Sequence, residues 1–459
     1  MPDIQRVFVA NRGEIAVRII RACRTLGIET VIGVSEADRD SLGARMADRA
    51  ICIGPPAATQ SYLRPEIIVH AACGTGCQAV HPGYGFLSER AVFQRKCTEA
   101  GLIFVGPSAE AIEAMGDKLS AIRLAREAGV PVVPGSGELN SESEMRAEAA
   151  KIGYPCLLKA SAGGGGRGMR IVRTEEDLAA AFSGARAEAG AAFGDPTVYL
   201  EKFIENARHI EIQIVGDLHG NICHLFERDC SVQRRHQKLI EEAPSPALPP
   251  DRRAEMAEAA LALARNVRYS GAGTVEFVYD ADQDRFYFLE MNTRIQVEHP
   301  VTEMITGIDL VQEQLRIAMG ETLSFRQSDL RIRGHAIECR INAENPRAGF
   351  APSPGRVTQW MVPEDSGLRL DTHCHEGYFV PPYYDSMIAK LIAWGEDREK
   401  AVERMLAGLA QFRIAGIATT IALHREVIAH PAFRAGRVTT RWLENEFLPA
   451  WTESTDKAA

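Results

Sequence analysis

The chain has 459 residues, of which 46% are hydrophobic and 25% charged, and its net charge at pH 7 is −9. The apolar content excludes an intrinsically disordered chain, and 39 glycines and 23 prolines exclude a collagen-like repeat. The length predicts roughly two to four domains, and the negative charge argues against binding to nucleic acid or to an anionic membrane surface.

No apolar run approaches the ~18 residues that span a bilayer, and the N-terminus lacks the basic and apolar regions of a secretory signal. We therefore expect a cytoplasmic protein. Ten cysteines are scattered without a C-x-x-C pair, so we expect buried reduced thiols rather than disulfides or zinc ligands. The run His373-Cys374-His375 would alternate between the two faces of a strand, which disfavours a metal site.

The first 110 or so residues alternate short apolar runs with helical periodicity. Strands are expected at 6–10, 31–34, 50–53, 79–81 and 103–105, and a helix at 15–26. This alternation predicts a parallel sheet with crossover helices. The first turn holds a single glycine, so the G-x-G-x-x-G fingerprint of a dinucleotide site is absent there.

The next part mixes both kinds of element. A helical stretch reaches about residue 135, Ser141 and Glu144 form a capping box for a second helix, and Thr174 caps a third. Strands are expected at 156–160, 169–173, 198–203 and 209–215, and helices at 251–267 and 303–319. Residues 320–333 read as a linker, and residues 334–445 mix strands and helices.

A glycine run separates the strands at 156–160 and 169–173, with four successive glycines at 163–166. A strand follows it rather than a helix, and G-K-[ST] is missing, so it is neither a Rossmann turn nor a P-loop. Its bare backbone N–H groups, flanked by Lys159 and Arg167, suit a lid that folds over phosphates. A merely mobile hairpin is the alternative.

Two strand-like runs within residues 274–291 predict a β-hairpin. If the turn centres on Gln283, Glu276 faces Glu290, with Asn292 on the same side of the ribbon. Opposed like charges need a cation or a shifted pKa. Carboxylates and an amide oxygen suit Mg²⁺ that substrate phosphates also hold. The alternative is a solvated acidic ribbon whose register has slipped.

Polar residues continue at every second position after this hairpin. They share one face while the backbone stays extended, and they are Glu290, Asn292, Arg294, Gln296 and Glu298. A site that binds a metal and a small anion would mix acids, amides and an arginine in this way. A third cluster, residues 227–238, is dense in donors for phosphate or carboxylate, and a solvated charged face is its alternative.

Together these segments resemble the biotin carboxylases, the ATP-grasp subunit or domain of biotin-dependent carboxylases. The resemblance runs from Val7 to about His424, and further matching motifs are Ala10–Ala16, His81–Glu89, Met115–Lys118, His335–Arg340 and Tyr384–Lys390. It implies a multidomain fold of α/β and α+β parts. These are an N-terminal Rossmann-like parallel sheet (1–115), an ATP-grasp domain (116–320) with a mobile glycine-rich lid (about 131–203), and a C-terminal mixed α+β domain (334–445).

The resemblance also implies roles for matching positions. ATP would be contacted by Lys118, Lys159, Gly165, Gly166, Glu201, Lys202, Ile204, His209, Gln233 and His236, with residues 201–204 holding the adenine. Mg²⁺ or Mn²⁺, as two ions, would be held by Glu276, Glu290 and Asn292. Bicarbonate and biotin would meet Tyr84, Lys238, Arg294, Gln296, Val297 (through its backbone), Glu298 and Arg340. Lys238, Arg294, Glu298 and Arg340 would be catalytic, with Glu298 as general base on bicarbonate and Arg340 stabilising the enolate of biotin.

The implied activity is ATP- and bicarbonate-dependent carboxylation of biotin through carboxyphosphate. This is the first half-reaction of an acyl-CoA carboxylase such as acetyl-CoA carboxylase, an enzyme of fatty acid biosynthesis. No Ala-Met-Lys-Met biotinylation signal occurs in the chain. We therefore expect a separate biotin carboxyl carrier protein and a separate carboxyltransferase, and the resemblance implies a homodimer of this chain.

Two other functions stay open. One is an ATP-grasp ligase that activates bicarbonate for an acceptor other than biotin. The other is a degenerate paralogue that binds nucleotide and serves as a regulatory subunit. Bicarbonate-dependent ATP cleavage that free biotin stimulates would separate the three.

Overall fold

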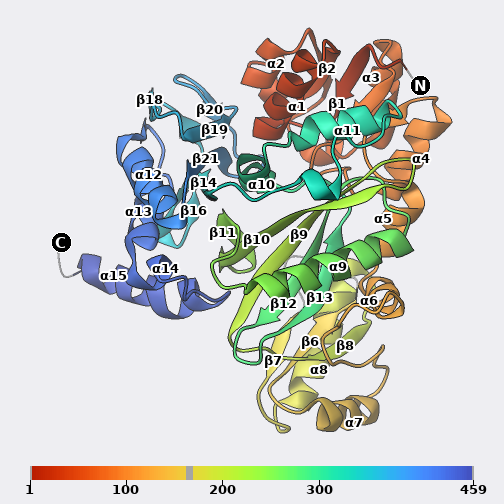
Figure 1. Ribbon diagram of the computed structural model, residues 1–459, viewed down its shortest axis with the longest axis vertical. Helices are drawn as coiled ribbons and strands as arrows, with labels where there is room; N and C mark the ends of the chain where they lie inside the picture. Colours follow the sequence, from red (N-terminus) through yellow and green to blue (C-terminus); the bar gives the residue numbers. More distant parts are fainter. Residues whose placement is uncertain (1–2, 162–168, 457–459) are drawn as a thin grey trace.

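The computed structural model describes residues 3–161 and 169–456. In Figure 1 the N-terminal part lies at the top, the C-terminal part at the left, and a small sheet with two helices at the lower end. Among the described residues, none of the helices has both the length and the apolar content needed to cross a bilayer. The predicted α/β and α+β multidomain fold is confirmed.

The N-terminal part is a parallel sheet in the order β3-β2-β1-β4-β5. Its strands are β1 (Arg6–Val9), β2 (Glu29–Ser35), β3 (Arg49–Gly54), β4 (Ala79–His81) and β5 (Ile103–Phe104). Its helices are α1 (Gly13–Thr25), α2 (Leu42–Met46), α3 (Pro65–Gly74), α4 (Ala91–Glu99) and α5 (Ala109–Gly116). Because side chains alternate along β1, Val7 and Val9 join the core beneath α1, and Phe8 joins the core beneath α3 and α4. The predicted parallel sheet is therefore confirmed.

A small antiparallel sheet, β7-β6-β8, carries the glycine run between its first two strands. Its elements are α6 (Lys118–Glu127), which leads into it, α7 (Glu142–Ile152), β6 (Cys156–Ala160), β7 (Arg170–Val172), α8 (Leu178–Phe193) and β8 (Val198–Lys202). Ser141 caps α7 by accepting the Glu144 N–H, as predicted, but the Glu144 side chain accepts the Asn140 N–H and not that of Ser141, so only half of the predicted capping box forms. The predicted cap at Thr174 is wrong: α8 begins four residues later, and the Thr174 hydroxyl donates to the Asp177 side chain instead.

The largest sheet is antiparallel, in the order β13-β12-β9-β10-β11-β14-β21-β19. Its first five strands are β9 (Ala207–Gly216), β10 (Ile222–Arg234), β11 (Gln237–Ala243), β12 (Gly271–Asp280) and β13 (Arg285–Asn292). Three helices accompany them: α9 (Pro250–Asn266), α10 (His299–Thr306) and α11 (Leu310–Ala318). Figure 1 shows α9 lying across these strands. The C-terminal part supplies the other three strands, so one sheet joins the two parts.

The C-terminal part packs α12 and α13 on the face of β14 and β21 that carries Ile337, Cys339 and Leu391. Its strands are β14 (His335–Asn342), β15 (Glu344–Asn345), β16 (Ala351–Pro352), β17 (Gly355–Arg356), β18 (Gln359–Met361), β19 (Leu368–Thr372), β20 (Phe379–Val380), β21 (Met387–Gly395) and β22 (Arg413–Ala415). Its helices are α12 (Arg398–Gln411), α13 (Ile421–Ala429), α14 (Pro431–Arg434) and α15 (Leu448–Asp456).

Two further expectations need correction. The helix predicted over 303–319 is broken into α10 and α11, because Gly307 adopts a left-handed φ of +76° and Asp309 caps the second helix. The solvated-face alternative for residues 227–238 is wrong, since this run forms most of β10 and its Glu227, Arg228 and Asp229 are buried.

The cysteines agree with the prediction of reduced thiols. All ten are free, and eight of them are buried. Cys52 and Cys73 are exposed, so the prediction of buried thiols is wrong for these two residues.

Candidate functional site

A cavity of about 1170 Å³ is lined by residues from all three parts of the chain. Every predicted site residue that the structure describes lines it, apart from Glu298. These residues are Tyr84, Lys118, Lys159, Glu201, Lys202, Ile204, His209, Gln233, His236, Lys238, Glu276, Glu290, Asn292, Arg294, Gln296, Val297 and Arg340. Glu298 lies fully buried behind the cavity wall and contacts both Lys238 and Arg340. Gly165 and Gly166 lie outside the described residues.

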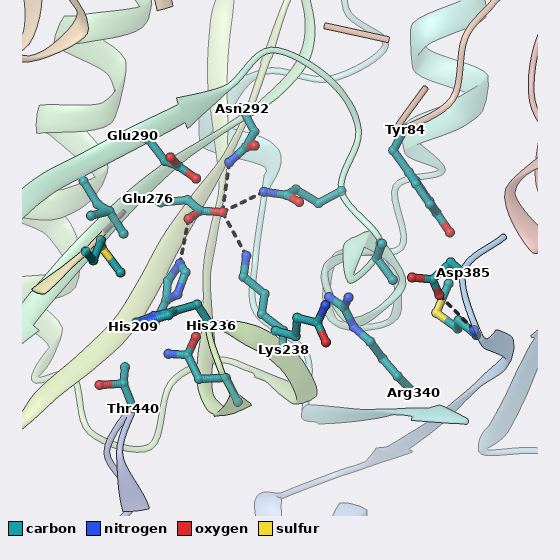
Figure 2. A pocket seen from close by; sticks show the side chains of 18 of the residues that line it. Tyr84, His209, His236, Lys238, Glu276, Glu290, Asn292, Arg340, Asp385 and Thr440 are labelled. Atoms are coloured by element: carbon teal, nitrogen blue, oxygen red, sulfur yellow. Dashed lines mark hydrogen bonds and ion pairs between the residues drawn. The ribbon is translucent and has the colours of Figure 1, made fainter. Parts of the chain in front are cut away.

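The acidic hairpin has the predicted register at its two facing acids and at Asn292. Glu276 pairs with Glu290, and Thr274 pairs with Asn292. A bulge after Glu276 shifts the remaining pairs by one residue, so the turn is not symmetric about Gln283. Figure 2 shows the Glu276 and Glu290 carboxylates close together in the cavity wall. The slipped-register alternative is therefore wrong.

Glu276 is the more heavily contacted of the two acids. Its Oε1 accepts hydrogen bonds from Lys238 Nζ at 2.8 Å and from the Asn292 and Gln296 amides at 2.9 Å. Its Oε2 lies 2.8 Å from His209 Nε2. Burial raises the pKa of Glu276, but Lys238 and His209 outweigh it and hold that pKa well below its ordinary value.

Glu290 has the opposite electrostatic setting. Burial raises its pKa, and the facing Glu276 carboxylate raises it further, against the attraction of Lys118. A bound cation would relieve this repulsion, because it would replace the lost hydration of the two acids. The hard oxygen donors of Glu276, Glu290 and Asn292 at one wall of the cavity fit Mg²⁺.

Lys238 is the centre of the charged cluster. Its Nζ lies 2.6 Å from Glu211 Oε2, 2.8 Å from Glu276 Oε1 and 2.6 Å from Glu298 Oε1. Burial lowers the pKa of Lys238, but the three carboxylates outweigh it and raise that pKa well above its ordinary value. The ammonium group is therefore permanently charged at neutral pH.

Glu298 lies between two cations. Its Oε1 contacts Lys238, and its Oε2 accepts from Arg340 Nη2 at 3.0 Å. Burial raises the pKa of Glu298, but Lys238, Arg340 and Arg228 together hold it well below the ordinary value. Glu298 is thus ionised at neutral pH and able to accept a proton.

The segment after β13 leaves the extended conformation at Asn292, earlier than predicted, yet its polar side chains still reach the cavity. Arg294 is held by Glu89 Oε2 at 2.8 Å and donates to Gln296 Oε1 at 2.9 Å. Lys390 Nζ donates to the Val297 carbonyl at 2.7 Å and so fixes that peptide. The result is a small polar recess of fixed donors.

The other end of the cavity suits a nucleotide. Lys159 forms a buried ion pair with Glu201, and burial lowers the pKa of Lys118. Apolar side chains line the same end, and these are Val133, Leu157, Ile171, Phe203 and Leu289. Cationic groups beside apolar walls match a phosphate chain attached to a flat base.

Some residues of this site were not predicted. Glu211 lies on β9, where His209, Glu211 and Gln213 share one face and alternate with Ile210, Ile212 and Ile214 on the other; that alternation was a usable signal. Thr440, Arg441 and Glu444 also line the cavity. No local pattern marks these three residues. They reach the cavity only through the tertiary fold, which brings Glu444 to accept a hydrogen bond from the Arg235 N–H, 209 residues away.

Comparison with known families gives three matches along the chain. The models are described as biotin carboxylase N-terminal domain (residues 3–112), carbamoyl-phosphate synthase L chain ATP-binding domain (117–326) and biotin carboxylase C-terminal domain (338–445). Biotin carboxylase 1 of Bacillus subtilis is 54% identical over 442 residues, which are 96% of this chain and 98% of that protein. The biotin carboxylase of Nostoc sp. is 52% identical over 440 residues, covering 96% and 98%.

Solved structures show the same similarity. A biotin carboxylase–βγ-ATP complex from Campylobacter jejuni superposes with a TM-score of 0.93 at 46% identity, covering 96% of this chain and 98% of that one. The biotin carboxylase domain dimer of the Hydrogenobacter thermophilus 2-oxoglutarate carboxylase, in complex with MgADP, ADP and bicarbonate, gives 0.92 at 50% identity, covering 97% and 98%.

Proposed function

This chain belongs to the biotin carboxylase family, and from that premise we propose how its cavity carboxylates biotin with ATP and bicarbonate. One observation carries the assignment of residues. A single cavity joins the opposed acids Glu276 and Glu290 to the recess around Lys238, with Glu298 and Arg340 beside it. A metal-nucleotide and a small anion would thus meet at one place.

In the first step, a bicarbonate oxygen attacks the γ-phosphorus of ATP, the bond to ADP breaks, and Glu298 takes the bicarbonate proton. The products are carboxyphosphate and ADP. Lys238 and Arg294 would hold the bicarbonate, and Lys118 and Lys159 would stabilise the phosphate charge. Mg²⁺, held by Glu276, Glu290 and Asn292, would neutralise charge on the phosphates.

The low pKa of Glu298 is consistent with this role. In the free enzyme Lys238 and Arg340 stabilise its ionised form. When the two cations turn toward bicarbonate and biotin, they stabilise the carboxylate less, and its basicity rises. Proton transfer thereby follows the arrival of both substrates.

In the second step, carboxyphosphate breaks down to CO₂ and phosphate. The phosphate takes the proton of the ureido nitrogen, which then attacks CO₂ to give carboxybiotin. Arg340, whose guanidinium remains charged, would stabilise the enolate oxygen. Tyr84 and Asp385 also line the cavity, on the side of Arg340 in Figure 2, and would contact the biotin rings.

The partners follow from the half-reaction. Carboxybiotin must pass its carboxyl group to an acceptor, so we propose a separate biotin carrier protein and a separate carboxyltransferase. The dimer of the Hydrogenobacter thermophilus domain supports a homodimer here. The final acceptor, fatty acid biosynthesis as the pathway, and a cytoplasmic location stay predictions.

The test measures ATP cleavage by the purified chain without bicarbonate, with bicarbonate, and with bicarbonate plus free biotin. We expect cleavage to require bicarbonate and to rise when biotin is added. Cleavage that biotin leaves unchanged would favour a ligase with another acceptor. Nucleotide binding without cleavage would favour a regulatory subunit.

A further inference from the structure

Within the described part of the chain, two glutamates behind Arg340 lack partners for three of their four oxygens. Glu241 on β11 and Glu338 on β14 are cross-strand partners in the antiparallel register. Both side chains are fully buried. One oxygen of Glu241 accepts from Arg340 Nε at 2.6 Å, and its other oxygen and both oxygens of Glu338 have no hydrogen-bond partner among these residues.

Directly opposed residues on antiparallel strands have Cβ atoms about 5 Å apart. The Glu241 and Glu338 side chains therefore leave the same face of the sheet into one buried space. Two ionised carboxylates could not share that space without a cation, whereas a single proton between them would satisfy an oxygen on each side.

The cations nearby are already engaged. Lys390 on β21 contacts Glu14 at 3.1 Å and the Val297 carbonyl at 2.7 Å. Arg340 is shared between Glu241 and Glu298. The charged groups that act most strongly on Glu338 are Lys390, Glu241, Arg340 and Glu298, and no cation among the described residues forms an ion pair with it.

The electrostatic balance supports a proton at this pair. Burial raises the pKa of Glu338 well above its ordinary value, Lys390 opposes this, and Glu241 adds to it. Burial also raises the pKa of Glu241 to about 7, against the attraction of Arg340. Because Arg340 binds Glu241 directly and does not bind Glu338, the proton belongs on Glu338.

We propose that Glu338 is a neutral carboxylic acid that donates a hydrogen bond to Glu241 and thereby positions Arg340 for the biotin step. Glu338 is a positioning residue, since it acts through Glu241. A neutral Glu338 also avoids a third negative charge near Arg340, which would weaken the guanidinium field at the enolate oxygen. The inference rests on the role of Arg340 in the proposed function.

The first test is spectroscopic and independent of activity. The infrared difference spectrum of wild type minus Glu338→Gln at pH 7 should contain the C=O stretching band of a protonated carboxylic acid, shifted in D₂O. Absence of that band would show that Glu338 is ionised and would overturn the proposal. This outcome is distinct from failure of the proposed function, which would appear as wild-type enzyme unable to carboxylate biotin.

The second test compares two variants of similar size. The Glu338→Gln amide is uncharged and can still donate to Glu241, so biotin carboxylation should stay within roughly twofold of wild type. Glu338→Leu cannot donate, so kcat for biotin carboxylation should fall about tenfold, with a much smaller change in ATP cleavage without biotin. Equal impairment of both variants, or equal losses in the two assays, would overturn the proposal. Should the Leu variant not fold, the spectrum and the Gln variant still decide.

Discussion

Lys238 shows how one side chain can organise a site of many charges. Its ammonium group contacts Glu211, Glu276 and Glu298, which come from β9, β12 and the turn before α10. Removing one partner of such a buried cluster leaves an uncompensated charge, which typically costs about 3–5 kcal/mol. The cluster therefore fixes Glu276 and Glu298 relative to each other before any substrate binds.

Replacing Glu298 tests the proposed base. Glu298→Gln keeps the shape but cannot accept a proton, so bicarbonate-dependent ATP cleavage should fall at least about 100-fold. ATP affinity should stay nearly unchanged, because Glu298 lies buried beside Lys238, in the part of the cavity proposed for bicarbonate and away from the part proposed for the nucleotide. Steady-state kinetics and titration with ATP give the two readouts. Normal turnover in this variant would remove Glu298 from the mechanism.

Replacing Arg340 separates the two half-steps. Arg340→Ala should reduce biotin carboxylation by about 100-fold or more, since the cation proposed to stabilise the enolate is lost, and should reduce ATP cleavage less. Arg331→Ala is the matched control, because Arg331 is exposed and donates its hydrogen bonds to nearby backbone carbonyls. Parallel losses in both assays would contradict the assigned role.

Among the secondary-structure elements, the break between α10 and α11 has a clear local cause. Gly307 ends α10 in the left-handed region at φ +76°, and Asp309 starts α11 by accepting the Gln312 N–H. The break lets α11 pack against α1 in the N-terminal core, while α10 stays on the large sheet beside Glu298. An unbroken helix could not serve both places.

Gly307→Ala should lower the free energy of unfolding by about 1 kcal/mol, because a Cβ is unfavourable at this φ. The cause is conformational only, since an added Cβ would meet no atom within 4 Å. Gly116→Ala at the end of α5 is the control, as that Cβ also meets nothing and φ there is not left-handed. Denaturant titration of both variants should show a loss only for Gly307→Ala; equal effects would argue against the conformational cause.

For the whole molecule, the continuous eight-stranded sheet is the main connection between the central and C-terminal parts. Glu242 on β11 reinforces it by binding Arg398 of α12 at 2.6 Å and His335 of β14 at 2.8 Å. Burial raises the pKa of Glu242, but Arg398 and His335 outweigh it and lower that pKa to about 2. The junction should therefore be sensitive to acid.

Because the folded carboxyl of Glu242 has the lower pKa, its stabilisation is complete above about pH 4.5 and is lost as the pH falls through about 2. The difference between the folded and unfolded pKa of Glu242 corresponds to roughly 3 kcal/mol of folding stability at neutral pH. Glu242→Gln should be less stable by about that amount at pH 7, and the gap to wild type should close in acid. Urea unfolding across pH checks this, with exposed Glu396→Gln as control; a gap that does not change with pH would contradict it.

Much of the fold and site could be predicted from local pattern. The pairing of Glu276 with Glu290 was predicted from a turn centred on Gln283, and it holds although a bulge after Glu276 shifts the remaining pairs by one residue. The parallel N-terminal sheet followed from alternating apolar runs and helices. The burial of Arg228 did not follow, since it depends on contacts with Glu211 of β9 and Thr302 of α10, and no local pattern marked the bulge after Glu276.

The sequence by itself determined most of the elements and the acidic hairpin through periodicity and spacing within short stretches, and it indicated the family through motifs shared with the biotin carboxylases. Only the tertiary structure decided that β14 joins β11, which brings Arg340 to Glu298 and Glu241 across 42 and 99 residues. The same pairing buries Glu338 opposite Glu241. Such contacts arise from the burial and pairing of distant strands, for which a short stretch of sequence has no periodic signal.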